Sequence, residues 1–493
     1  MSEDPRGEHR RARHDTAPGR EHLRASVHRD LERLNHPPAD WVVPRSAPDG
    51  RRAHDVLIVG AGMCALAALH ALRCNGIQHI QALDRRPAGR EGPWATYARM
   101  LTLRSPKDLP GPCFGLPGLS FRAWYEARWG AGAWDSLDKI PTRMWMDYLV
   151  WYRDVLDLPV RNTVDVTRIG PTEDGLLRVE AGDKRMYARH VVLAQGREGV
   201  GGPRYPAFCR DLPAERLSHS LDEVDFAALA GRRVAIVGGS SSACDNAGAA
   251  LEAGAAEVVM LVRAADFARV NKTKGAGYPG FVQAFAAADD AWRWQVWHYI
   301  HRTARVPPPQ ASVLRLTRHP RFRLRFDAGV EAAGFDGREV VLETASGPER
   351  TDHVILGTGY TVDLTRIGLL GAAACDVATW GDRYRPPAGL EDEELARAPY
   401  LGPAFELQAK SPDGPDWLSR VHVFSHAASQ SHWTVAGDIP AVDLGATRLA
   451  DGIARLLFEA DRAAHWQRLL DFDDPELEGW EWADARTGAS DRD

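Results

Sequence analysis

The chain has 493 residues, of which 44% are hydrophobic and 26% are charged, a composition typical of a soluble globular protein of two or three domains. The formal net charge of −6 provides no broad basic field, which argues against nucleic acid as a partner. No apolar run is long enough to span a bilayer, so no membrane partner is expected and the cytoplasm is the default location.

Both ends of the chain lack the patterns of packed structure. Residues 1–50 are rich in Arg, His, Pro and Asp and show no sustained periodicity, apart from a short helical pattern at 26–34. They contain no apolar stretch of the kind that a secretory signal needs. We predict a mobile N-terminal tail over residues 1–50 and a second tail over residues 471–493.

The first strong signal is a glycine-rich turn between a strand pattern and a helix pattern. Residues 55–59 are typical of a buried parallel strand, the turn carries Gly60, Gly62 and Ala65, and an apolar helix follows. The next strand ends at Asp84, about 20 residues after Gly62, where the carboxylate that binds a ribose is expected. The segment therefore predicts a Rossmann-type dinucleotide site.

A second turn of this kind follows the apolar run 233–237. Its candidate binding residues are small: Gly238, Ser240, Ser241 and Ser242. Ser240 replaces the second glycine of the fingerprint, while the hydroxyls of the next two serines can donate to a pyrophosphate. The following strand ends at Arg263 in place of the usual acid, and an arginine there can pair with a 2′-phosphate. Two such turns in one chain predict FAD at the first and NADPH at the second.

Between and after these turns the pattern changes twice. Residues 92–155 are rich in Trp, Pro and Met and are predicted to be a helical insertion whose aromatic spacing indicates core packing. Residues 352–360 form another strand and turn, interpreted as the crossing back into the first domain. Farther on, Gly437 and Asp438 precede an amphipathic helix, where a carboxylate can accept a hydrogen bond from a ribityl hydroxyl of FAD.

The predicted fold class is α/β, with two Rossmann-like dinucleotide-binding domains. The FAD-binding domain is split in sequence, with the NADPH domain inserted between its parts. The expected segments are 51–210 for the first part of the FAD-binding domain, 211–345 for the NAD(P)H-binding domain and 346–470 for the second part with the C-terminal helix.

The cysteines argue against a dithiol mechanism. The six residues show neither a CxxC nor a CxxxxC pair, and they lie at positions 64, 74, 113, 209, 244 and 375. A flavin disulfide reductase needs two thiols close together beside the flavin. We therefore disfavour that class, and we expect no metal site.

From about residue 55 to 470 the chain resembles flavin monooxygenases that use FAD and NADPH in two Rossmann domains. The segments 100–109, 119–121 and 147–151, with the Thr358-Gly-Tyr360 turn, are similar in type and order to motifs of bacterial amino-acid N-hydroxylases that act on ornithine or lysine. This resemblance implies that Lys107 holds a substrate carboxylate and that Asn271 holds the substrate. The chain also looks like flavoproteins associated with FAD-dependent urate hydroxylation.

A third group of flavin monooxygenases is disfavoured. The Baeyer-Villiger fingerprint FxGxxxHxxxW would place Phe, Gly and Trp around His219, but those positions hold Pro213, Glu215 and Glu223. Ketone insertion is therefore not expected.

The resemblance implies a single-component monooxygenase in which NADPH reduces FAD, oxygen adds at flavin C4a, and the hydroperoxide transfers oxygen to the substrate. The leading hypothesis is N-oxygenation of a small carboxylate-bearing amine. One alternative is hydroxylation of a urate-like heteroaromatic, and another is a flavin redox sensor without turnover. The partners expected are a small-molecule substrate and O2, and a homo-oligomer is left open.

Charged and titratable residues leave the substrate undecided. Arg99, Arg104 and Lys107 suggest an anionic substrate group, although a solvated loop face explains them almost as well. His219, His426 and His432 are candidate bases, but buried histidines are more often structural, and no catalytic base is assigned.

Overall fold

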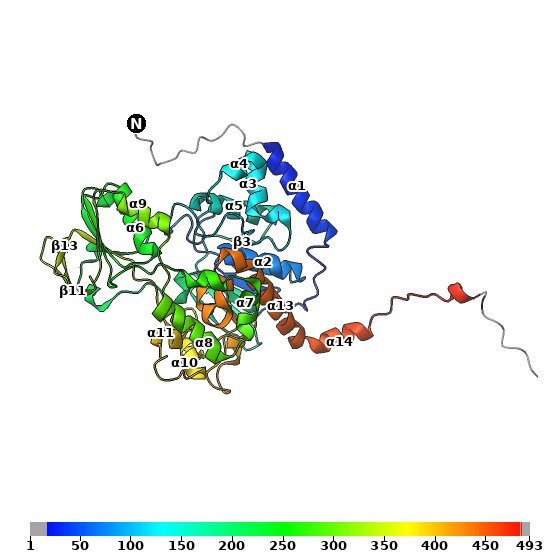
Figure 1. Cartoon of the computed structure of the whole chain (residues 1–493). Coiled ribbons are helices and arrows are strands. Elements are labelled where there is room, and N and C mark those ends of the chain that lie inside the picture. Colours follow the sequence, from blue (N-terminus) through cyan, green and yellow to red (C-terminus); the bar gives the residue numbers. More distant parts are fainter. Residues whose placement is uncertain (1–16, 484, 486–493) are drawn as a thin grey trace, which may run out of the picture.

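The computed structural model describes residues 17–483 and 485 (Figure 1). Its first sheet has seven strands in the order β3-β2-β1-β6-β5-β4, with β15 paired to β6. The strands are β1 (His54–Val59), β2 (Ile80–Leu83), β3 (Val160–Arg161), β4 (Arg168–Pro171), β5 (Leu177–Ala181), β6 (Lys184–Leu193) and β15 (Val421–Val423). Strands β3, β2, β1, β6 and β15 run parallel, while β4 and β5 form an antiparallel extension.

The second sheet has five parallel strands in the order β10-β9-β8-β14-β7. They are β7 (Leu217–His219), β8 (Arg233–Val237), β9 (Glu257–Leu261), β10 (Phe322–Arg325) and β14 (His353–Leu356). A small antiparallel sheet beside it contains β11 (Val330–Phe335), β12 (Val340–Thr344) and β13 (Glu349–Thr351). Because β15 returns to the first sheet after the second is complete, the predicted α/β fold with a split first domain and an inserted second one is confirmed.

The predicted domain boundary at 345/346 needs correction. Strand β14 pairs with β7 and β8, so residues 353–356 belong to the second sheet and do not yet cross back. The crossing begins at Gly357, immediately after this strand. An apolar strand pattern does not tell which sheet a strand joins, because that depends on partners more than 100 residues away in sequence.

Helices cover both sheets. Helix α2 (Met63–Cys74) follows the first turn and packs against α13 (Val442–Ala460), while α6 (Ser241–Glu252) follows the second turn and packs against α9 (Gln310–Thr317). Figure 1 places α6, α9, β11 and β13 together on one side of the molecule, separate from α2 and α13.

Residues 92–155 contribute three α-helices that pack around a core of aromatic side chains. They are α3 (Phe121–Trp129), α4 (Ala131–Ser136) and α5 (Thr142–Val155). Phe121, Trp124, Trp145 and Tyr148 are each no more than 1% exposed, and their rings contact one another at centroid separations of 4.9–6.0 Å. This insertion is therefore held together by its own aromatic core.

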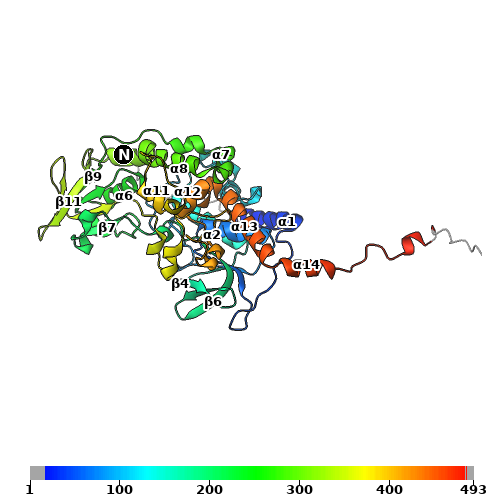
Figure 2. The ribbon, with the colours of Figure 1, turned by 90° about the horizontal axis from the view of Figure 1, so that it is seen from below.

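A second helical segment leaves the inserted domain and packs on the second part of the first domain. It comprises α7 (Pro279–Ala284), α8 (Asp290–His298) and a π-helix at Tyr299–Ala304, and it lies near α11 (Glu393–Arg397) and α12 (Ser429–His432) (Figure 2). The ring of Trp294 in α8 also lies 6.4 Å from that of Trp380 in α10 (Trp380–Arg383). The indole N–H of Trp297 donates to the carbonyl of Ser429, and the guanidinium of Arg293 donates to the carbonyl of Ser431. These bonds tie the two domains together on this side.

The predicted N-terminal tail is wrong for its described part. Residues Ala17–Arg33 form helix α1, which packs on α3, and Val27 and Val42 are only 2% and 3% exposed. Leu23, Val27 and Leu31 form a stripe at four-residue spacing, and polar residues that include Arg24 and Arg29 separate them in the sequence. Residues 1–16 of the predicted tail lie outside the described part.

The C-terminal end leaves the body of the molecule. Helix α14 (Arg462–Leu470) has no buried residue, and residues 471–478 are all exposed (Figure 1). The carboxylate of Asp461, at the start of this extension, is buried and accepts hydrogen bonds from Arg45 and Arg189 at 2.5 and 2.6 Å. Among the described residues, no helix is both long and apolar enough to cross a membrane.

Candidate functional site

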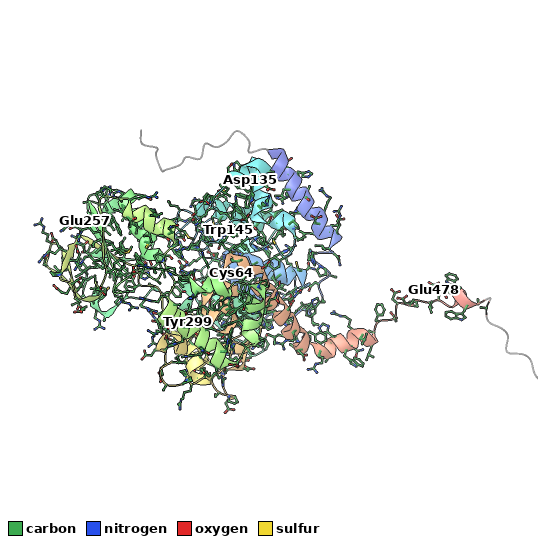
Figure 3. All side chains as sticks on the ribbon, in the orientation of Figure 1. Cys64, Asp135, Trp145, Glu257, Tyr299 and Glu478 are labelled. Atoms are coloured by element: carbon green, nitrogen blue, oxygen red, sulfur yellow. The ribbon has the colours of Figure 1, made fainter. Side chains whose placement is uncertain are left out.

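A cavity of about 340 Å³ lies between the first glycine-rich turn and the start of α6, the helix that follows the second turn. Its walls come from both domains: the first turn, the end of β2, residues 92–105, residues 194–198 after β6, the start of α6 and residues 436–439. Figure 3 shows Cys64, one of the lining residues, near the middle of the molecule with Trp145 of the insertion close by in this view. The carboxyl ends of parallel strands are where α/β proteins bind nucleotides, and this cavity has that location.

The first turn is shaped by a close backbone approach. Gly60 has φ +103°, and a Cβ there would lie 2.6 Å from the carbonyl oxygen of Ala194 on the neighbouring chain segment. The carboxylate of Asp84 accepts hydrogen bonds from the backbone N–H groups of Ala61 and Arg86, both at 2.8 Å. Burial raises the pKa of Asp84, which these two bonds oppose by stabilising its charged form.

The predicted FAD ligands of the first turn divide into two kinds. Gly60, Gly62 and Asp84 line the cavity, whereas Ala65 is fully buried in α2 and is a packing residue. At the other end of the chain, Gly437 and Asp438 also line the cavity. Burial raises the pKa of Asp438, and the Thr434 side chain lowers it again by hydrogen bonding.

The second turn repeats this geometry. Gly238 has φ +138°, and a Cβ there would lie 2.5 Å from the carbonyl oxygen of Gly357. Ser240 is the N-cap residue of α6 without a side-chain capping bond, Ser241 is half-buried, and Ser242 reaches the cavity. Helices α2 and α6 both begin without a side-chain cap, which leaves N–H groups for an anion such as a pyrophosphate.

Arg263 lies two residues past the end of β9 and is exposed. Its position at the strand end suits a 2′-phosphate ligand. It does not line the cavity, so the preference for NADPH stays a prediction.

The structure does not bring Lys107 to the cavity, although the resemblance assigns it to the substrate. Its ammonium group donates to the carbonyls of Trp134 and Leu137 at 2.8 and 2.5 Å and lies 5.0 Å from the Trp134 ring centroid. The side chain therefore holds α4 against the loop. Asn271 does not line the cavity either. Its side chain caps a short 3₁₀ helix by accepting a hydrogen bond from the N–H of Thr273.

The other predicted cations line the cavity and are engaged by protein groups. Arg104 forms an ion pair with Asp245 of α6 at 2.9 Å, and Arg99 donates to the carbonyls of Thr96 and Asp222. The Arg104 pair crosses from one domain to the other.

Only one of the three candidate histidine bases lines the cavity. His219 is buried and its Nδ1 accepts from the N–H of Leu221, while His432 is stacked on Phe405 with its Nε2 3.0 Å from the carbonyl oxygen of Gly402. His426 is part of the cavity wall, and burial, followed by the charge of Arg197, lowers its pKa to about 3. It is therefore neutral at physiological pH and can accept or donate a hydrogen bond.

The cavity also holds groups that the sequence analysis missed. Gln195 and Arg197 follow β6, and Asp245 and Asn246 lie on α6. Polar residues just beyond the carboxyl end of a parallel strand are the signal that would have found the first two. Cys64 lies on the wall as well, and burial raises the pKa of its thiol to about 12, which keeps it protonated and weakly nucleophilic.

The residues present fit a bound FAD. The glycine turn allows close approach of a pyrophosphate, Asp84 is held by two N–H groups in the place of a ribose ligand, and Asp438 supplies a second carboxylate on the cavity wall. The second turn presents the same cradle from the other domain. Fold and site together define a flavoprotein oxidoreductase with two dinucleotide-binding domains.

Comparison with known proteins makes this class more specific. Residues 57–276 match a family described as pyridine nucleotide-disulphide oxidoreductase. An FAD-dependent urate hydroxylase from Xanthomonas campestris pv. campestris is 39% identical over 461 residues, which cover 93% of this chain and 97% of the relative. The chain therefore belongs to the flavin-dependent monooxygenase family that includes this urate hydroxylase.

Solved structures agree on the fold. An ornithine hydroxylase from Pseudomonas aeruginosa has a TM-score of 0.63 at 21% identity and covers 82% of this chain and 100% of its own. The Kutzneria ornithine N-hydroxylase, solved with reduced FAD, NADP+ and L-ornithine, has a TM-score of 0.65 at 18% identity, over 82% of this chain and 99% of that one. An L-lysine 6-monooxygenase from Pseudomonas syringae scores 0.62 at 19% identity, over 83% and 99%.

Proposed function

We propose that this chain is an FAD- and NADPH-dependent monooxygenase that hydroxylates urate or a closely related oxopurine. The observation that carries the proposal is the 39% identity with an FAD-dependent urate hydroxylase, which extends over 93% of the chain. That relation spans both domains and the insertion. It thus includes every segment that contributes to the cavity wall.

The positions of the two residues predicted to bind an amino-acid substrate support this choice. Lys107 and Asn271 are the residues that an amino-acid N-hydroxylase would use for its substrate, and both are engaged in local structure away from the cavity. The cavity instead offers Arg197, neutral His426 and the side chain of Gln195. Groups of this kind suit a flat molecule with alternating carbonyl and N–H edges.

In this proposal the chain's own residues bind and orient, while FAD supplies the electron transfer and oxygen activation. Gly60, Gly62, Asp84, Gly437 and Asp438 hold FAD. Ser241, Ser242 and Arg263, with the N-terminus of α6, hold NADPH. The cavity wall excludes water and keeps the substrate within reach of the flavin.

A mixture of the purified holoprotein, NADPH, O2 and urate tests the proposal. The expected result is urate-dependent NADPH oxidation and a product heavier than urate by one oxygen atom, with the second oxygen atom recovered as water. NADPH oxidation that yields only hydrogen peroxide, with urate unchanged, would show that urate is not the acceptor.

N-oxygenation of a carboxylate-bearing amine is the second candidate, favoured by the fold likeness to ornithine and lysine hydroxylases. The same assay with ornithine, lysine and diamines tests it. A hydroxylamine product from one of these amines, without turnover of urate, would select this candidate over the first.

A further inference from the structure

Arg197 and Tyr360 lie on the two chain segments that connect the domains. The segment leaving the first sheet and the segment returning from the second run side by side. The N–H of Arg204 donates to the carbonyl of Gly359, and the N–H of Thr361 donates to the carbonyl of Gly202, both at 3.0 Å. Across these paired segments, the Arg197 guanidinium lies 5.5 Å from the centroid of the Tyr360 ring.

Arg197 differs from the other arginines on the cavity wall. Arg85 and Arg86 pair with Glu198, Arg104 pairs with Asp245, and Arg99 donates to two backbone carbonyls. Within the described part of the chain the Arg197 side chain has no hydrogen bond or ion pair, and its guanidinium lies over the ring of Tyr360. Its guanidinium therefore keeps its hydrogen-bond donors for a ligand.

The surroundings of Arg197 suit a planar anion. His426 lies edge-to-face with the Tyr360 ring at 5.2 Å, and both His426 and Arg197 line the cavity. Asp438 is near enough for the charge of Arg197 to lower the pKa of its carboxyl, against the larger effect of burial. A guanidinium that lies over an aromatic ring can still form two parallel hydrogen bonds to adjacent acceptors.

We propose that Arg197 binds the anionic edge of the oxopurine substrate, with His426 as the neighbouring hydrogen-bonding group. This inference rests on the proposed function. Urate is a monoanion at neutral pH and presents adjacent oxygen and nitrogen acceptors in one plane, which match the fork of a guanidinium. FAD and NADPH also carry anionic phosphates, so the experiment must separate the three ligands.

Equilibrium binding to the oxidised holoprotein, without turnover, tests the inference. Urate and NADP+ are titrated by calorimetry, and the FAD-to-protein ratio is measured from the flavin absorbance, for wild type, Arg197→Gln and Arg197→Lys. We expect a 10- to 100-fold weaker urate affinity for Arg197→Gln, the range of about one charged hydrogen bond, with partial recovery in Arg197→Lys. The FAD content and NADP+ affinity remain within twofold of wild type.

Two controls accompany the binding measurement. Arg210→Gln removes an exposed arginine outside the cavity wall and leaves urate binding unchanged. Hypoxanthine, which is neutral at pH 7, should bind wild type and Arg197→Gln equally, because it has no anionic edge.

The outcomes separate this inference from the proposed function. If wild type neither binds nor hydroxylates urate, the proposed function fails. If wild type binds urate and Arg197→Gln binds it equally well, the substrate role of Arg197 is wrong. Loss of FAD or NADP+ in Arg197→Gln with unchanged urate affinity would assign the arginine to a cofactor phosphate and overturn the inference.

Discussion

The guanidinium of Arg104 forms an ion pair with the carboxylate of Asp245 at 2.9 Å, and this pair joins the loop that lines the cavity to the first helix of the inserted domain. The Asp245 side chain is 4% exposed and also accepts from the hydroxyl of Ser312 at 2.8 Å. One buried carboxylate thus connects residues that are 141 positions apart in the chain. The pair ties the cavity loop to the helix that follows the second glycine turn.

Loss of this ion pair is expected to weaken both stability and NADPH binding. Arg104→Gln leaves a buried carboxylate with one neutral donor, so we expect a loss of about 1–3 kcal/mol in the free energy of unfolding. Because Arg104 is partly exposed, the lower end of this range is expected. A double-mutant cycle with Asp245→Asn, followed by urea unfolding and NADP+ titration, measures the coupling. Additive effects of the two changes would show that the pair contributes nothing of its own.

Asp84 is expected to be required for FAD retention. Asp84→Asn keeps the size of the side chain but removes the charge that two backbone N–H groups and a ribose hydroxyl would share. We expect the FAD dissociation constant to rise about 10- to 100-fold. Flavin fluorescence during reconstitution of the apoprotein measures it, with the exposed Asp183→Asn as control. Equal FAD affinity in both variants would remove Asp84 from the cofactor site.

For Lys107, the resemblance implies a role in substrate binding, whereas the structure implies a role in stability. Because its ammonium group donates to two carbonyls near α4, Lys107→Met should lower the free energy of unfolding by about 1–3 kcal/mol while leaving substrate affinity within twofold of wild type. Thermal unfolding and substrate titration measure the two effects, and the exposed Lys184→Met serves as control. A selective loss of substrate affinity at unchanged stability would restore the substrate role.

Arg263 is expected to select the phosphorylated cofactor. Arg263→Ala should raise the KM for NADPH by about tenfold, the size of one charge-assisted contact, and spare the KM for NADH. Arg269→Ala, in the same segment but paired with Asp266 at 2.6 Å, is the matched control. Equal losses with both nucleotides would exclude a 2′-phosphate contact.

A buried histidine pair predicts loss of stability in mild acid. His190 Nδ1 lies 3.0 Å from His422 Nε2, and His422 Nδ1 lies 2.7 Å from the carbonyl oxygen of Ala404. The His422 ring therefore donates to Ala404 and accepts from His190. Burial lowers the pKa of both histidines, to about 4 for His422, while an unfolded histidine has a pKa near 6.5.

Because the folded pKa is the lower one, the stabilisation is complete above pH 6.5 and is lost as the pH falls towards 4. Urea unfolding between pH 7 and pH 4.5 should show this decline. In His422→Gln the free energy of unfolding should change less steeply with pH. The slope should fall by about 1 kcal/mol per pH unit for each histidine whose pKa is no longer lowered in the folded state. An unchanged slope would mean that the pair does not govern acid stability.

The sequence by itself determined the two dinucleotide units, because a buried strand, a glycine turn, a helix and an acid at the next strand end are local patterns with fixed spacing. It also indicated that the first domain is split, since the strand and turn at residues 352–360 follow the second unit and predict a return to the first domain. The absence of a CxxC or CxxxxC pair argued against a dithiol mechanism.

Only the tertiary structure decided which residues meet. Helix α1 packs through a narrow apolar stripe, β14 joins the second sheet, and Lys107 turns to the carbonyls of α4 instead of the cavity. Arg197 contacts Tyr360, and Arg204 donates a hydrogen bond to the carbonyl of Tyr360, although each arginine is more than 150 residues from Tyr360 in the chain. Such contacts depend on how distant segments pair, and periodicity and motif spacing carry no information about that pairing.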